Sequence, residues 1–172
     1  MNPSLVGSEM CIRDRPNACC IVPEKREEVT TEGGIDIKRN HSILGPIIDG
    51  LKKNNIKVSL FIDSSKDQIK LARELGADII EIHSGEFCRK VQDGKDFQLE
   101  LNRIKESCSY ASSIGLETHI GHGITFNSIS ELSKIEEVKE FNIGHFIIAE
   151  SIFIGLKESI KTFKELIKKG RS

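Results

Sequence analysis

The segment KVSLFID, Lys57 to Asp63, places two kinds of side chain on the two faces of one short β-strand. Val58, Leu60 and Ile62 form a wholly aliphatic face, and the opposite face is mixed in polarity. The segment IIEIH, Ile79 to His83, repeats this arrangement. An aliphatic face that packs on helices, opposite a mixed face that lines a site, is typical of a parallel β-barrel.

Short β-prone segments alternate with helical patterns along the whole chain, which predicts parallel strands joined by crossover helices. An open doubly wound sheet is the alternative to a barrel, but no glycine-rich dinucleotide fingerprint follows any strand. The barrel is therefore favoured. The predicted strands are Ala18–Glu24, Lys57–Asp63, Asp78–His83, Leu116–His122 and Glu140–His145; the predicted helices begin at Ile43, Ser65, Phe97 and Ser128, and two more follow His145.

The chain has 172 residues and five predicted strands, whereas a complete (β/α)8 TIM-type barrel takes about 250 residues. We therefore expect residues 16–172 to be the last five strand–helix units of a single barrel domain. The stretch SLVGSEMCIRDR, Ser4 to Arg15, has no amphipathic period. We interpret residues 1–15 as a non-native leader, a translated adapter from a sequencing library; a genuine flexible extension is the alternative.

Composition argues against several classes of partner. Lys and Arg total 25 against 26 Asp and Glu, and there is no Trp and one Tyr, so neither nucleic acid nor an anionic membrane is expected to bind. No apolar run is long enough to span a membrane and no secretory pattern is present, which favours the cytoplasm. The five cysteines lack metal or disulfide spacing, and Cys19 and Cys20 are expected to be small buried residues.

Polar side chains stand where the predicted strands end. Barrel enzymes build their sites at this rim, because it carries the strand-to-helix loops and the N-termini of the following helices. The candidates are Glu24, Asp63, Glu81 with His83, His119 with His122, and His145.

The tripeptide Ile-Gly-His occurs twice at this rim, ending at His122 and at His145. Gly144 allows close approach of a ligand to the backbone, and a helix beginning near His145 directs free N–H groups at the same place, which favours a phosphate. Gly123 repeats the arrangement one strand earlier. The alternatives are a tight turn with a hydrogen-bonded His145, and a structural rather than catalytic His122.

Glu81 lies on an otherwise isoleucine strand, where a carboxylate is costly unless it is paired or catalytic. A structural partner of a lysine or of His83 is the alternative. Glu81, His83, His119 and His122 could also form a metal site, but their spacing is unspecific and no metal is predicted. In the long polar loop that follows the first strand, Thr30 offers a hydroxyl to a substrate, unless the loop is merely solvated.

Five blocks occur in a fixed order: IVPEKREEVTTEGG, VSLFID, EIHSG, GHGIT and NIGH. In these blocks the chain resembles the pyridoxine 5'-phosphate synthase family, from Pro16 to the C-terminus. The resemblance implies a condensation of 3-amino-2-oxopropyl phosphate with 1-deoxy-D-xylulose 5-phosphate to pyridoxine 5'-phosphate, phosphate and water. It also implies a homo-oligomer with no metal or organic cofactor.

The resemblance further implies a role for each matching residue. Thr30 would hold the deoxyxylulose phosphate, Glu81 would stabilise a transition state, and His122 would act as general acid. Gly123, Gly144 and His145 would bind the aminooxopropyl phosphate.

The family's first three strands carry further catalytic and phosphate-binding groups whose motifs are absent here, so the chain alone is expected to be inactive. A phosphate-ester-binding barrel without catalysis and another phosphate-handling barrel enzyme remain alternatives. The loop VPEKREEVTTEGG argues against the latter.

Overall fold

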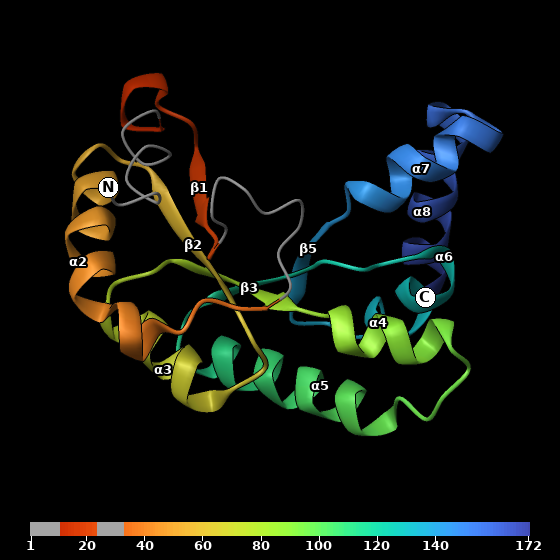
Figure 1. The fold of residues 1–172 in the computed structure, drawn as a ribbon, viewed down its shortest axis with the longest axis horizontal. Coiled ribbons are helices and arrows are strands. Elements are labelled where there is room, and N and C mark those ends of the chain that lie inside the picture. The colour runs from red at the N-terminus through yellow and green to blue at the C-terminus, as the bar shows by residue number, and fades with distance from the viewer. Residues whose placement is uncertain (1–10, 24–32) are drawn as a thin grey trace.

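Short parallel strands and helices alternate along the chain in this computed structural model, which describes residues 11–23 and 33–172 (Figure 1). The alternation predicted from the sequence is confirmed. In chain order the elements are β1 (Ala18–Ile21), α2 (Ile37–Lys53), β2 (Lys57–Ile62), α3 (Lys66–Glu74), β3 (Ile79–His83), α4 (Gly85–Gln92), α5 (Gln98–Ser113), β4 (Glu117–Gly121), α6 (Phe126–Leu132), β5 (Val138–Asn142), α7 (His145–Ile154) and α8 (Leu156–Gly170).

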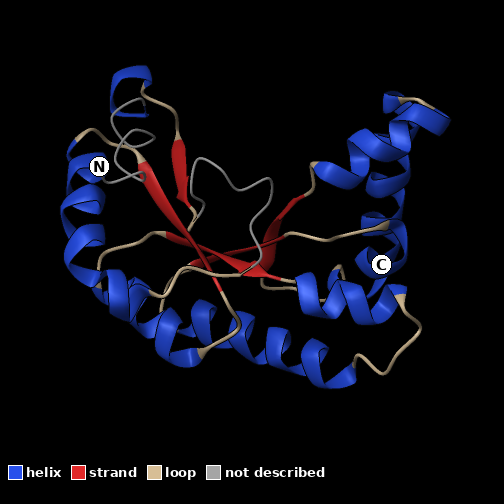
Figure 2. Cartoon of the chain, in the orientation of Figure 1, coloured by secondary structure: helices blue, strands red, loops and turns tan. Residues whose placement is uncertain are grey.

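The five strands form one parallel sheet in the order β1-β2-β3-β4-β5, so every strand lies beside its neighbour in the sequence. Right-handed crossovers in one continuous direction place their helices on the same face of a sheet. Figure 2 shows this arrangement, with the described helices forming an arc around the strands. A doubly wound sheet would require a reversal of strand order, which these five strands lack.

The sheet is strongly curved, as contacts to Glu81 on β3 show. Cys20 of β1 and Asn142 of β5 both reach the Oε2 atom of Glu81, at 3.5 and 2.7 Å. In a flat sheet, β1 and β5 would lie about 19 Å apart, four strand spacings. The strands therefore curl toward one another as in a barrel wall, and the predicted partial barrel is confirmed.

The core lies between the sheet and its covering helices. Val58, Leu60 and Ile62 are fully buried there, as the alternation in KVSLFID predicts. Each aliphatic side chain of this size contributes about 1.5–3 kcal/mol when fully buried. The partners include Leu44, Ile48 and Leu51 of α2, Ile69 and Ala72 of α3, Ile80 and Ile82 of β3, and Leu101, Ile104 and Cys108 of α5.

Several predicted boundaries are wrong. β5 spans Val138–Asn142, so it begins two residues before the predicted start and ends three residues before the predicted end. α2 begins at Ile37 rather than Ile43, because Asp36 caps it by accepting a hydrogen bond from the N–H of Arg39 at 3.2 Å. α4 has no counterpart among the predicted helices.

At the N-terminal end of the described part, residues 11–14 form a helical turn. Cys11 and Ile12 pack in part against the core. The division of the chain at residues 15 and 16 stays a prediction.

Candidate functional site

A cleft of about 520 Å³ opens at the carboxyl ends of β3, β4 and β5. Its walls combine predicted site residues with apolar side chains. The lining residues are Val22, Phe61, Glu81, His122, Gly123, Ile124, Thr125, Asn142, Ile143, Gly144, His145, Phe146 and Ala149. Among the predicted residues that the structure describes, Glu81, His122, Gly123, Gly144 and His145 are thus brought together.

Glu81 projects from the middle of β3 and is 9% exposed. Its Oε2 accepts hydrogen bonds from the amide of Asn142 at 2.7 Å and from the thiol of Cys20 at 3.5 Å. Burial raises the pKa of Glu81, and these two hydrogen bonds oppose that effect by favouring the charged form. Among residues 11–23 and 33–172 its hydrogen-bond donors are therefore an amide and a thiol, and neither a lysine nor His83.

Gly121 makes room for the carboxyl group of Glu81. A Cβ atom at Gly121 would collide with Oε1 of Glu81 and would lie 3.3 Å from the Cβ of Asn142. Only a residue without a side chain fits between these two groups. The first glycine of IGHGIT is thus required by packing inside the site.

His122 follows β4 with its backbone in the left-handed region, at φ 72°. This conformation is uncommon for a residue with a side chain. The hydroxyl of Ser84 stabilises it by donating to the carbonyl oxygens of Gly121 at 2.9 Å and of His122 at 2.8 Å. Gly123, at φ 76°, continues the turn at little steric cost.

His83 lies next to His122, with ring centroids 5.0 Å apart. The Nδ1 atom of His83 is 3.2 Å from Oδ1 of Asp63, which also accepts a hydrogen bond from the backbone N–H of Gly34 at 3.1 Å. The hydrogen bond from His83 holds the pKa of Asp63 below its usual value. Asp63 and His83 therefore lie at the predicted rim, beside the cleft rather than in its wall.

The start of α7 forms another part of the cleft wall. Gly144 is the N-cap residue of this helix and His145 is its first residue, as predicted. A Cβ atom at Gly144 would meet nothing within 4 Å, so a ligand can approach the backbone here. The first N–H groups of a helix have no partner within the helix and attract anions.

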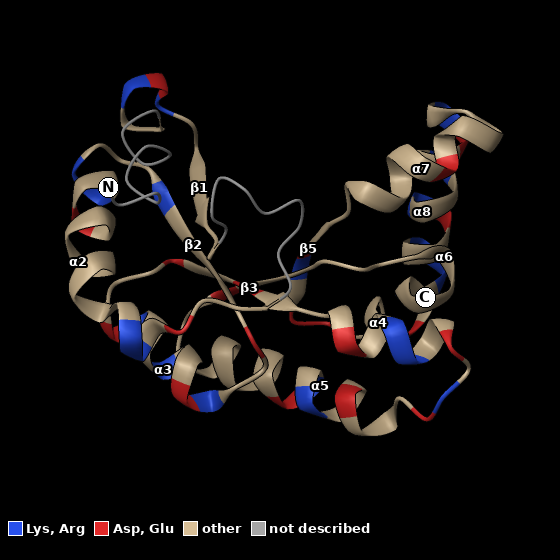
Figure 3. Ribbon diagram, viewed as in Figure 1, with Lys and Arg blue, Asp and Glu red and all other residues tan. Residues whose placement is uncertain are grey.

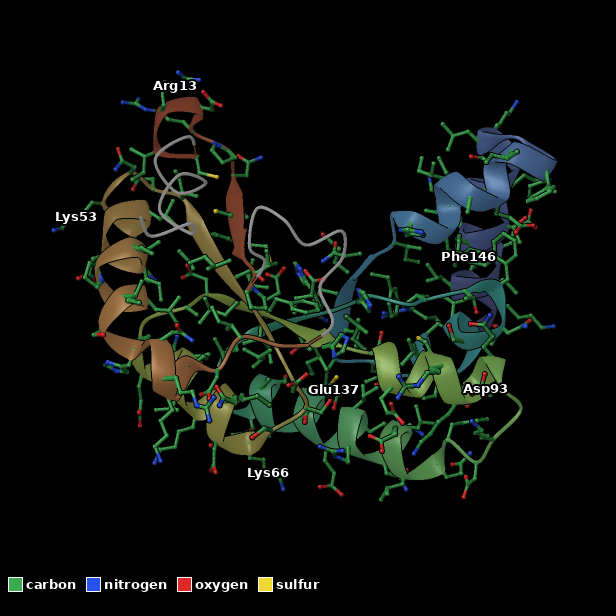
Figure 4. The ribbon with its side chains drawn as sticks, viewed as in Figure 1. Arg13, Lys53, Lys66, Asp93, Glu137 and Phe146 are labelled. Carbon is green, nitrogen blue, oxygen red and sulfur yellow. The ribbon has the colours of Figure 1, made fainter. Side chains whose placement is uncertain are left out.

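Aromatic packing fixes the position of this helix start. Phe146, labelled on α7 in Figure 4, packs against Phe126 of α6 and Phe163 of α8 at centroid distances of 5.0 and 5.8 Å. Phe126 and Phe163 are 4.7 Å apart. The three rings join α6, α7 and α8 at the edge of the cleft.

No Lys or Arg is among the described residues that line the cleft. Figure 3 marks Lys and Arg positions on the helices, notably α2, α3, α4 and α5. An anion in the described part of this site would therefore be bound by backbone N–H groups and imidazole rather than by a basic side chain.

Some predicted site residues are not part of the described cleft. Thr30 and Glu24 lie outside the described residues. His119 is buried but pairs with Glu117, at 2.9 Å, and does not line the cleft. In residues 11–23 and 33–172 no three His, Cys, Asp or Glu side chains converge to hold a metal ion.

Three residues of the site escape prediction from the sequence: Asn142, Ser84 and Cys20. Asn142 belongs to the block NIGH and Ser84 to the block EIHSG. Their closeness in sequence to the predicted site residues Gly144 and His83 is the signal from which they could be predicted. Cys20 was expected to be buried, which is wrong: it is exposed on β1, and Cys19 is only partly buried. Although Cys20 as a whole is exposed, its thiol lies against Glu81, where desolvation and the neighbouring carboxylate raise the pKa of Cys20 to about 12.

Comparison with known families gives a match over nearly the whole chain. The family model described as "Pyridoxal phosphate biosynthesis protein PdxJ" matches residues 1–169. A pyridoxine 5'-phosphate synthase of Pelagibacter ubique (strain HTCC1062) is 44% identical over 161 residues, 94% of this chain and 67% of the relative. The enzyme of that name from Sulfurihydrogenibium sp. (strain YO3AOP1) is 44% identical over 171 residues, 99% of this chain and 70% of the relative.

A third relative of the same name, from Xanthobacter autotrophicus, is 44% identical over 93% of this chain, and the match spans 63% of its own length. The chain therefore spans about two thirds of the length of these curated relatives. Among solved structures, a mandelate oxidase with 3,3-difluoro-2-hydroxy-3-phenylpropionic acid matches with a TM-score of 0.52 at 13% identity, over 73% of this chain and 38% of the oxidase. This likeness concerns the fold alone.

Proposed function

Since the chain belongs to the PdxJ family, whose curated members are pyridoxine 5'-phosphate synthases, we propose that it carries the C-terminal part of such an enzyme's active site. The reaction is the condensation of 3-amino-2-oxopropyl phosphate with 1-deoxy-D-xylulose 5-phosphate to pyridoxine 5'-phosphate, with release of phosphate and water. One observation carries the proposal: Glu81, His122, Gly144 and His145 line a single cleft.

Glu81 and His122 have different roles in this ring closure. A buried carboxylate stabilises positive charge as it develops on the amine nitrogen of a condensation intermediate, because low local polarity strengthens the interaction. His122 donates a proton to an oxygen that departs as water. An imidazole suits this role because its pKa lies near neutral pH.

The phosphate group of the aminooxopropyl substrate binds at the start of α7. Gly144 leaves the backbone open, His145 offers an imidazole, and Gly123 supplies a further N–H from the facing turn. Thr30, outside the described residues, holds the phosphate of the second substrate. Binding of both anions accords with the small phosphate substrates of the family.

The protein acts as a homo-oligomer in the cytoplasm. An apolar surface on α7 and α8, formed by Ile148, Ile152, Phe153 and Leu156, is exposed to solvent and supports self-association. All five cysteines are free, which fits a reducing compartment. None of the helices within residues 11–23 and 33–172 has the length and apolar character needed to cross a membrane.

The test is product formation. The chain is joined to the first three strand–helix units of a relative, and pyridoxine 5'-phosphate is followed by absorbance after both substrates are added. We expect activity that falls at least about 100-fold in His122→Ala and is unchanged in His41→Ala, an exposed histidine of α2. The chain without these added units should give no measurable product.

A folded, joined protein that binds both phosphates without turnover would contradict the proposal. That result would favour the phosphate-ester-binding barrel, with Glu81 and His122 in structural roles. Equal loss of activity in the two histidine variants would contradict the role of His122.

A further inference from the structure

Asn142 connects Glu81 with the start of α7, where the phosphate is proposed to bind. It is the last residue of β5 and directly precedes Ile143 and Gly144, where the phosphate-binding wall begins. Its side chain reaches Glu81 on β3, and its amide Nδ2 lies 2.7 Å from Oε2 of Glu81. One residue thus belongs by its backbone to the anion site and by its side chain to the buried carboxylate.

The hydrogen bond from Asn142 is the stronger of the two that Oε2 of Glu81 accepts. A distance of 2.7 Å is typical of an amide that donates to a charged carboxylate. The Cys20 thiol is a weaker donor and lies 3.5 Å away. No Lys or Arg forms an ion pair with Glu81 among the described residues, so the amide is the main group that favours the charged form.

The surrounding groups restrict the position of the carboxyl group. Gly121 leaves space on one side for Oε1, because a Cβ atom at that position would occupy the same volume. Asn142 and Cys20 hold Oε2 from the strands at the two edges of the sheet. Contacts from β1, β4 and β5 therefore fix a side chain of β3 in the middle of the cleft.

We propose that Asn142 is the positioning residue of Glu81: its amide fixes the carboxyl group beside the phosphate-binding turn and favours the charged form, against the effect of burial. The inference rests on the proposed function for the role of Glu81 in the reaction. In this proposal Asn142 acts through the carboxyl group of Glu81.

The charged groups that face Glu81 come from several strands. His119 on β4 favours its charged form and Glu140 on β5 opposes it. The thiol of Cys20 on β1 also donates to it. Any measured change must therefore be compared with a variant that leaves these groups in place.

The experiment is a carboxyl titration of the full chain labelled with 13C at glutamate side chains, with the Glu81 signal identified by its loss in Glu81→Gln. In Asn142→Ala we expect the titration midpoint of Glu81 to rise by about one pH unit, because a hydrogen bond to the charged form is lost. Asn54→Ala, which removes an amide bonded to the carbonyl oxygen of Gly50 on α2, should leave the midpoint unchanged.

Asn142→Asp keeps the size of the side chain and is the variant to titrate if Asn142→Ala fails to fold. A second carboxylate at this distance should raise the Glu81 midpoint further than alanine does. An unchanged midpoint in the folded Asn142 variants would overturn the inference. Equal shifts in Asn142→Ala and Asn54→Ala would also overturn it, since a general loosening would then be the cause.

Product formation by the joined enzyme distinguishes this inference from the proposed function. Asn142→Ala should lower kcat about tenfold or more while the KM values for both phosphates change less than about twofold. An inactive joined enzyme whose Glu81 midpoint still depends on Asn142 would overturn the function and retain the pairing. An active enzyme with an unchanged kcat in Asn142→Ala would overturn the positioning role alone.

Discussion

Glu81 is a buried acid whose environment favours a bound proton, even though two donors oppose this. Burial is the largest cause of its raised pKa. Between the ordinary value of 4.5 and the raised value, the folded protein holds a proton that the unfolded chain has released. The stability contributed by this group is therefore complete below pH 4.5 and is lost as the pH rises through the folded-state pKa.

Replacing Glu81 by glutamine should remove this pH dependence. We expect Glu81→Gln to match the original protein in free energy of unfolding at about pH 4 and to exceed it at about pH 8, because the amide carries no charge to desolvate. Urea unfolding at both pH values measures this. Glu106→Gln, at an exposed position, is the control, and a gain of equal size at both pH values would contradict the explanation.

Gly121 gives a second prediction at the same scale. Gly121→Ala should lower the free energy of unfolding by about 1–3 kcal/mol, because the added methyl group collides with the carboxyl group of Glu81. Gly50→Ala, inside α2 with its nearest neighbour atom at 3.6 Å, should instead raise it by about 0.5–1 kcal/mol. Thermal and urea unfolding of both variants test the contrast, and changes of the same sign would contradict it.

Much of the site could be predicted from individual residues, because glycines and histidines at strand ends carry local signals. Gly144 and His145 begin α7 as expected, and His122 lies in a glycine-flanked turn. The pairing of Asn142 with Glu81 could not be predicted in this way. It joins residues 61 positions apart and depends on how far the sheet curves, which no local pattern specifies.

At the scale of elements, helices α2 and α3 begin in different ways. Asp36 caps α2 with its side chain, whereas Ser65 precedes α3 without a side-chain cap hydrogen bond. Asp36 also contacts Gln68 of α3, at 3.4 Å from its amide. A single cap residue therefore stabilises one helix start and links it to the next helix.

These two caps give matched variants. Asp36→Ala should lower the free energy of unfolding by about 1 kcal/mol, because the N–H of Arg39 loses its acceptor. Ser65→Ala should change it by less than about 0.5 kcal/mol, since no cap hydrogen bond is lost. Urea denaturation followed by circular dichroism measures both, and equal losses would show that the observed cap geometry does not determine stability.

Elements with strong periodicity are predictable from the sequence, and elements set by context are not. The segment KVSLFID forms β2, which ends at Ile62, one residue before the predicted end. The prediction holds because the aliphatic face of this strand packs in the core beneath the helices. The limits of β5 differ from the prediction because the strand ends at Asn142 and does not extend through Ile143, Gly144 and His145. A register shift between Thr118 and His119 of β4 also alters its pairing with β5. α4 is only eight residues long and is stabilised by burial of Phe87 and Cys88, a tertiary effect.

For the whole molecule, the exposed apolar surface of α7 and α8 is the most unusual feature. Ile152 and Phe153 are 80% and 82% exposed, although α7 is largely apolar. Exposed large apolar side chains that gather on neighbouring helices mark interaction sites. Self-association would remove these side chains from water.

A charged substitution should therefore separate association from folding. We expect Phe153→Lys to reduce the average mass in light scattering at high protein concentration, while the free energy of unfolding changes by less than about 0.5 kcal/mol. Leu99→Lys, at a 66% exposed position of α5, should leave the mass unchanged. An unaltered mass in Phe153→Lys would show that this surface does not drive association.

The curvature that lets β1 and β5 meet at Glu81 also orders events during folding. Both contacts close segments of 61 residues, whereas each helix and its adjoining strand form over short distances in the chain. Long segments cost more entropy to close, so contacts between them are slow to form. We expect the amides of the helices to be protected from hydrogen exchange before Glu81 contacts Asn142. The cleft around Glu81 would then form late in folding.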